Sequence, residues 1–155
     1  MNRIDTVRDY VDRVLAKLPD ELDRRYAYIH IYGVAQACAM IAMKRGEAVE
    51  LAVIAGMLHD IYRYTAMEGF EHAHRGAAMA RDILHELGGF EETEIERICN
   101  AVYHHSSKRE RHDSFDEVLK DADVMQHCLY DPTVPAVPNE RVRYEKLKNE
   151  FGLKK

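Results

Sequence analysis

The hydrophobic positions of this chain recur with helical spacing along nearly its whole length. A first helix is predicted by four apolar residues that lie three to four positions apart: Ile4, Val7, Val11 and Leu15. Pro19 interrupts this pattern. A second, longer helix is predicted from about residue 21 to residue 45, and Gly46 is placed where a C-terminal glycine would end it.

The rest of the chain repeats this alternation of apolar helical stripes and polar breaks. Further helices are predicted over about residues 47–59, 71–87, 92–105, 114–130 and 140–151. Residues 62–70, 106–113 and 131–139 are predicted as loops, the last because it holds three of the four prolines. Ser114 and Glu117 have the spacing of a capping box at the start of a helix. Strand-like alternation is nearly absent, so we expect an all-α fold, a single helical domain of about six to seven helices.

Composition narrows the class of protein. With 155 residues, 46% hydrophobic and 32% charged, the chain has the make-up of one soluble globular domain. A net charge of −5 gives no reason to expect a nucleic-acid polymer as partner. Cys38, Cys99 and Cys128 form no CxxC and are expected to be reduced and buried, as in a cytoplasmic protein. The charged N-terminus predicts no signal peptide, and no apolar run approaches the ~20 residues that span a membrane.

Histidines and carboxylates fall on positions that should face the core. His59 and Asp60 close the apolar run of residues 51–58, His30 shares a helix face with Val34, and Asp123 follows an apolar stripe. His105 likewise continues the stripe of its own helix. A single core histidine is more often satisfied by a hydrogen bond, but buried carboxylates without a partner cost several kcal/mol. A shared divalent ion would compensate the whole group, and a nitrogen and oxygen ligand set favours Mn, Fe, Co, Ni or Zn.

The order His30, His59-Asp60, Asp123 resembles the HD superfamily of metal-dependent phosphohydrolases. The flanking residues match too: the segment around His59 resembles the family's LLHDIG, and residues 122–123 resemble its closing AD motif, which selects Asp123 over Asp121. The resemblance covers about residues 25–130 and implies an HD-domain architecture with a metal site in the bundle core. Residues 1–155 would form this one domain, in which 131–155 add a proline-containing loop and a C-terminal helix.

A second group of histidines resembles the ligands of two-metal members of that superfamily. The H-x-x-x-G-A stretch selects His72 over His74, and the histidine pair at the end of the fifth predicted helix favours His105, with His104 as a further candidate. Asp60 would then bridge two ions. In the alternative interpretation, these histidines line the pocket and bind a substrate phosphate. Four histidines match no motif and are expected in surface or packing roles: His74, His85, His112 and His127.

The resemblance implies a phosphohydrolase in which a hydroxide on one or two divalent ions attacks phosphorus, with Asp60 and His59 as catalytic residues. The expected substrate is a small phosphate ester or anhydride, in particular a nucleotide, and residues expected to bind it are Arg63, His104 and Arg75. Arg63 follows Tyr62 where many members have Gly-Lys. Two other functions stay open: an HD-fold di-iron oxygenase and a nucleotide-binding regulatory module without catalysis. A homodimer also stays open, because the first and last helices could pack on the core or on a second copy.

Overall fold

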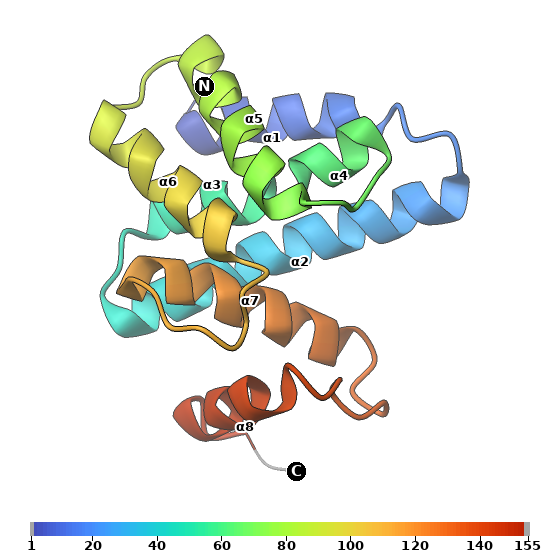
Figure 1. Ribbon diagram of the computed structural model, residues 1–155, viewed down its shortest axis with the longest axis vertical. Coiled ribbons are helices and arrows are strands. Elements are labelled where there is room, and N and C mark those ends of the chain that lie inside the picture. The colour runs from blue at the N-terminus through green and yellow to red at the C-terminus, as the bar shows by residue number, and fades with distance from the viewer. Residues whose placement is uncertain (1, 154–155) are drawn as a thin grey trace.

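The protein was analysed as a computed structural model that describes residues 2–153, and this part of the chain is helical without strands (Figure 1). The all-α prediction is confirmed. The described residues contain eight helices: α1 (Arg3–Leu15), α2 (Glu21–Arg45), α3 (Val49–Leu58), α4 (Ile61–Ala66), α5 (His72–Leu87), α6 (Glu92–His104), α7 (Ser114–Tyr130) and α8 (Arg141–Glu150).

The long helix α2 crosses the middle of the molecule and organises the others around it. In Figure 1, α1, α4 and α5 lie on one side of α2, and α7 and α8 lie on the other. α2 packs against α3 and α7, and α5 packs against α6. The core between these helices contains fully buried side chains from all of them, such as Ile31, Ile54 and Ile98. α1 and α8 also contribute to this core through residues such as Val11 and Leu147, so both terminal helices pack on their own chain.

Several helix ends follow the predicted signals. The side chain of Asp20 caps α2 by accepting a hydrogen bond from the backbone N–H of Asp23. Gly46 ends α2 in the left-handed conformation with φ = 72°, which a residue without Cβ adopts at little cost. The predicted capping box of α7 is wrong, because Asp113, one residue earlier, caps that helix by accepting from the Phe115 N–H.

The predicted loop over residues 62–70 is wrong in its first part. A short helix, α4, begins directly after Asp60 and ends at Ala66, and the capping residue Met67 has a left-handed φ of 57°. Ile61 is fully buried and anchors α4 to the core. One and a half turns are too few for apolar periodicity to reveal a helix. The helix count therefore rises from the expected six or seven to eight.

α2 is more apolar than the pattern of its sequence predicted. Within the described residues, it is the one helix long and apolar enough to cross a membrane by length and composition, with a mean hydropathy of 1.2 over its best window. Only 44% of that window is buried inside the bundle. α2 nevertheless supplies the central core contacts and the ligand candidate His30. All three cysteines are free and buried, as predicted.

Candidate metal centre

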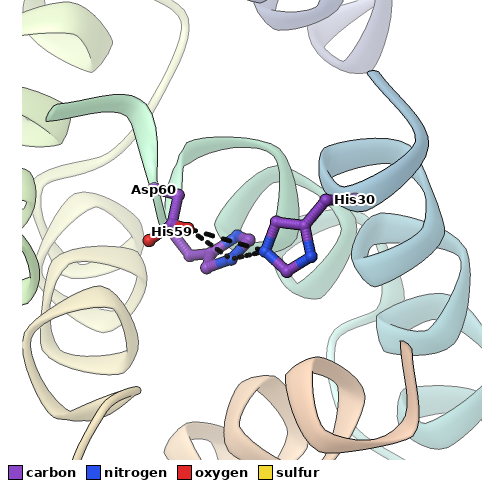
Figure 2. A group of neighbouring side chains, drawn as sticks. All are labelled: His30, His59 and Asp60. Carbon is purple, nitrogen blue, oxygen red and sulfur yellow. Dashed lines mark hydrogen bonds and ion pairs between the residues drawn. The ribbon is translucent and has the colours of Figure 1, made fainter. Parts of the chain in front are cut away.

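Side chains from three separate segments meet in the centre of the bundle. His30 comes from α2, Asp123 comes from α7, and His59-Asp60 form the turn between α3 and α4. The Nε2 atom of His30 lies 3.1 Å from His59 Nε2, 3.5 Å from Asp60 Oδ2 and 3.6 Å from Asp123 Oδ1. Figure 2 shows His30, His59 and Asp60 pointing toward one another. All four residues are buried, and these separations fit nitrogen and oxygen atoms about 2 Å from one ion.

The backbone places His59 and Asp60 so that both side chains reach the same point. α3 ends at Leu58, and Asp60 leaves helical geometry with φ = −109° and ψ = 13° before α4 begins. α3 also approaches α2 closely at Gly56, where an added Cβ would lie 2.8 Å from the Cα of Ala35. This close approach brings His59 up to His30, because Gly56 lies on the turn of α3 that precedes His59.

A second pair of histidines faces the other oxygen of Asp60. His72, at the start of α5, and His105, at the end of α6, have their Nε2 atoms 3.3 Å apart. Each of these two Nε2 atoms lies 3.5 Å from Asp60 Oδ1. Oδ2 of Asp60 faces His30 and His59 instead. Asp60 therefore stands between two donor sets, as a carboxylate that bridges two ions would.

Hydrogen bonds fix the orientation of the four histidine rings. Nδ1 of His59, His72 and His105 lies 2.7–3.0 Å from the backbone carbonyl oxygen of the residue three positions earlier. His30 Nδ1 lies 2.7 Å from Gln126 Oε1. If each Nδ1 donates its proton to these oxygens, the Nε2 atoms carry lone pairs that face the cluster. The Nε2 atoms of each pair are 3.1–3.3 Å apart. Lone pairs that face each other across this distance repel, and a cation between them would remove the repulsion.

The two buried carboxylates of the cluster also indicate bound cations. Among the described residues, two buried side-chain oxygens have no hydrogen-bond partner, Asp60 Oδ1 and Asp123 Oδ1. Burial alone would raise the pKa of Asp123, but the ammonium of Lys108, 2.5 Å from its Oδ2, and nearby histidines lower it well below its usual range. Burial likewise opposes ionisation of Asp60, yet His59 and the neighbouring histidines lower its pKa. Two ionised carboxylates, each with a bare oxygen, fit divalent ions.

Not every residue expected at the site reaches it. His104 does not join the cluster: its Nδ1 lies 2.7 Å from Asp116 Oδ2, and its ring stacks on His112. The ring turns away because adjacent residues at a helix end project about 100° apart, and His105 takes the inward direction. Arg75 bonds to Tyr62 and Glu68 on the surface. Arg63 remains close, with its guanidinium 3.9 Å from Asp60 Oδ2 and a side chain that is 57% exposed.

The structure adds two residues that sequence reasoning did not place at the site. The Nε2 atom of His127 lies 3.4 Å from Asp123 Oδ1, its ring stacks on His30, and its Nδ1 lies 2.9 Å from Glu140 Oε1. Its spacing of four after Asp123 on α7 is the signal that could have found it. Lys108, in the polar loop of residues 106–113, donates to Asp123 and to the His105 carbonyl. His74, His85 and His112 contact Tyr103, Glu92 and His104, respectively, which lie outside the cluster.

The pKa of His59 predicts how the metal-free protein responds to acid. Burial lowers this pKa from 6.5 to about 3 despite the nearby carboxylates. Between these values the unfolded chain binds a proton that the folded chain does not, so stability present above pH 6.5 is lost as the pH falls. We expect the free energy of unfolding to fall by about 2 kcal/mol between about pH 6.5 and 4.5. Urea unfolding of chelator-treated protein measures this.

Two variants test that assignment. His59→Asn should flatten the pH dependence in this window, whereas replacing the exposed His85 with asparagine should leave it unchanged. Asp60 and Asp123 do not interfere, because their unfolded-state pKa of 3.8 places their effect at lower pH. An unaltered slope in the His59 variant would contradict the prediction.

Comparisons with known proteins identify the family and the fold. The family model described as HD domain matches residues 27–127. A crystal structure described as that of a predicted HD superfamily hydrolase from an uncultured Thermotogales bacterium superposes with a TM-score of 0.60. It is 22% identical in sequence, and the match covers 96% of this chain and 87% of that one. No curated protein matches the chain. Because the family model spans most of the chain and includes all six ligand candidates, the protein belongs to the HD domain family.

Proposed function

We propose that this protein is a metal-dependent phosphohydrolase that cleaves a phosphate ester or anhydride of a nucleotide. The observation that carries the proposal is the position of Asp60, whose two oxygens face two separate histidine pairs. Such a carboxylate suits two ions held close together, which can stabilise both the attacking and the leaving oxygen in phosphoryl transfer. The Thermotogales protein with the similar fold is itself described as a predicted hydrolase, which supports the reaction class.

The residues divide into two ligand sets that share Asp60. One ion would be held by His30, His59 and Asp123 together with Asp60 Oδ2, and the other by His72 and His105 together with Oδ1. Bound ions lower the pKa of a coordinated water to about 7 and offset the negative charge of the phosphoryl group. The chain's contribution is to present unprotonated Nε2 atoms and ionised carboxylates. The oxygens that hold each Nδ1 keep the rings in this state.

The open edge of the cluster determines where a substrate can enter. His30, His59, Asp60, His105 and Asp123 are buried. The side chains of His72 and Arg63 are 24% and 57% exposed. A phosphate that approaches over this edge meets a guanidinium already 3.9 Å from Asp60 Oδ2. Arginine can bind two phosphate oxygens at once, so we assign Arg63 to substrate binding.

Arg63 and Arg75 form a matched pair for testing this assignment. We expect Arg63→Met to raise KM for a phosphate substrate about tenfold or more, since a charge-assisted bidentate contact is lost, while the metal content stays unchanged. Arg75→Met should change KM less than about twofold, because that guanidinium bonds to Tyr62 and Glu68 on the surface. Steady-state kinetics and elemental analysis measure both. Equal effects of the two variants would contradict a specific role for Arg63.

Aromatic side chains near the metal centre favour a nucleotide among phosphate esters. The ring of Tyr26 stacks parallel on His30, with ring centroids 5.9 Å apart, and contacts Tyr130 edge to face. Tyr26 is 42% exposed, and Tyr130 is 54% exposed. Partly exposed rings beside a phosphate site offer a surface on which a base can stack.

The decisive experiment measures product release in anaerobic buffer. Protein reconstituted with Mn or Fe is incubated with a panel of nucleoside mono-, di- and polyphosphates, and released phosphate and nucleoside products are quantified. Turnover without O₂ would support hydrolysis and exclude the di-iron oxygenase, which requires O₂. Turnover only when O₂ is admitted would refute the proposal in favour of the oxygenase. Tight nucleotide binding without turnover under any metal would refute it in favour of a regulatory module.

A further inference from the structure

A cavity lies between α7, α8 and the polar loop of residues 106–113, and most of the side chains that line it are charged. Its volume is about 590 Å³, which is within the range of sites that hold small molecules. α8 packs on α7, on the side of the molecule away from α1 and α5 (Figure 1). We call this space the α8 cavity. The six metal-ligand candidates are not among the described residues that line it, so the α8 cavity is separate from the metal centre.

Three basic side chains at the α8 cavity have no partner within residues 2–153: Arg109 and Arg111 of the loop, and Lys146 of α8. All three residues are exposed. They place three positive charges around one cavity in a chain whose net charge is −5. Like charges that are gathered in this way repel one another, and an anion in the cavity would turn that repulsion into attraction.

The carboxylates at the α8 cavity do not neutralise these three cations, because nearly all of them are held by other basic side chains. Three of the four carboxylates accept from arginines at distances of 2.6–2.8 Å: Glu117 from Arg143, Asp121 from Arg45 and Arg143, and Glu150 from Arg45. Lys120 also pairs with Glu117 and supplies the third balancing charge. The fourth carboxylate, Glu110, is 73% exposed. Three unpaired cations therefore stand against one carboxylate.

Two arginines and a lysine around one cavity favour a ligand that carries phosphoryl groups. A guanidinium can bind two oxygens of one phosphoryl group at once, and an ammonium adds a compact point charge. Ser114, the first residue of α7, also lines the α8 cavity and offers a hydroxyl donor. The cavity is much larger than a single phosphate ion, and three cations can offset more negative charge than one phosphate carries. Both features favour a ligand with more than one phosphoryl group.

We propose that the α8 cavity binds a small polyanion with two or more phosphoryl groups, held by Arg109, Arg111 and Lys146. Binding there would need no metal ion. Lys108 connects this site to the metal centre, because it lines the cavity and its ammonium donates to Asp123. The loop that presents the two arginines to the ligand is thus the loop that holds a metal-ligand candidate. The proposal does not depend on the reaction that the metal centre performs.

Isothermal titration calorimetry of the chelator-treated full chain with inorganic tripolyphosphate tests the site. Metal-free protein is used so that the probe cannot bind through ions at the metal centre. We expect a Kd of about 100 µM or lower at about 0.15 M salt. Inorganic phosphate should bind at least about tenfold more weakly, because it can engage fewer of the cations at once. Tripolyphosphate that does not bind at millimolar concentration would overturn the proposal, as would equal affinities for the two probes.

Neutral variants of the cavity cations test where the probe binds. Arg111→Met and Lys146→Met should each weaken tripolyphosphate binding by about fivefold or more, since each removes a charge-assisted contact. Arg25→Met and Lys17→Met are the matched controls, because these exposed cations lie outside the described lining of the α8 cavity. Screening by salt should keep their effect below about twofold. Equal losses in cavity and control variants would mean non-specific attraction and would refute the site. Far-ultraviolet circular dichroism confirms that each variant is folded.

Two further variants separate the α8 cavity from the metal centre. Glu110→Gln should strengthen tripolyphosphate binding by about twofold or more, because it removes the one lining carboxylate that no arginine holds. An affinity that stays the same or falls would place the probe outside the cavity. Arg63→Met, at the metal centre, should leave the affinity of the metal-free protein within about twofold of wild type. A large loss in this variant would instead assign the probe to the metal centre and would overturn the proposal.

Discussion

Replacing Asp60 with asparagine is expected to abolish metal binding at both proposed sites and to lower the proposed phosphohydrolase activity by about 10³-fold or more. Each oxygen of Asp60 faces a different histidine pair, so one substitution removes the shared anionic ligand from both sites. Ions at such a centre supply several kcal/mol of transition-state stabilisation, and each 1.36 kcal/mol corresponds to about tenfold in rate. Elemental analysis and anaerobic phosphate release measure the two losses on the same preparation.

The stability of the Asp60→Asn variant separates a ligand role from a structural one. In the metal-free state, Asp60 Oδ1 is buried without a hydrogen-bond partner among the described residues. An asparagine amide can donate to the Nε2 lone pairs nearby, so the metal-free variant should be more stable than the metal-free wild type by about 1 kcal/mol. With metal present, the wild type should be the more stable protein. A variant less stable in both states would mean that Asp60 acts as a structural residue.

The second large effect on metal binding and activity is expected at Asp123 and should be absent at the nearby Asp121. Asp123→Asn should weaken at least the proposed metal site at His30 and His59 and lower activity by about 10²- to 10³-fold. Asp121 instead accepts hydrogen bonds from Arg45 and Arg143, 2.7 and 2.8 Å away, on the far side of α7. Asp121→Asn should therefore leave metal content and activity per folded molecule unchanged.

Unfolding measurements complete this comparison. The side chain of Asp121 is 9% exposed and pairs with two arginines, so its neutralisation should cost about 2–3 kcal/mol of unfolding free energy. Asp123→Asn should also destabilise the protein, because Lys108 loses the carboxylate 2.5 Å away. Metal content and activity, rather than stability, therefore distinguish the two positions. Loss of metal from the Asp121 variant would contradict the assignment of Asp123 as the ligand.

The ligand candidates that the sequence identified are those whose position follows from one helix at a time. His30, His105 and Asp123 continue apolar stripes, and helical periodicity places such residues on the core side. His59 and Asp60 end an apolar run, where burial of both is unusual. Helical periodicity was a poorer guide for residues that do not continue an apolar stripe. His104 lies beside His105 in the chain, yet it points to Asp116.

The residues missed by sequence reasoning depend on contacts between helices. His127 lies near Asp123 on α7, but its contact with the His30 ring exists only because α2 and α7 pack together. Lys108 belongs to a polar loop that resembles an exposed segment, and it becomes buried because that loop folds back over Asp123. No pattern within one segment reports such contacts, since they depend on how segments far apart in the sequence are brought together.

The sequence by itself determined the helical class, most of the helix boundaries, the buried cysteines and the family, because local periodicity, caps and adjacent motif residues are properties of short segments. The tertiary structure alone decided how the candidates are grouped. It showed that the two oxygens of Asp60 face different histidine pairs, and that Gly56 lets α3 approach α2 closely enough for His59 to meet His30. It also showed that basic residues of the polar loop and of α8 line one cavity. These features arise from the packing of helices against one another, which no single helix encodes.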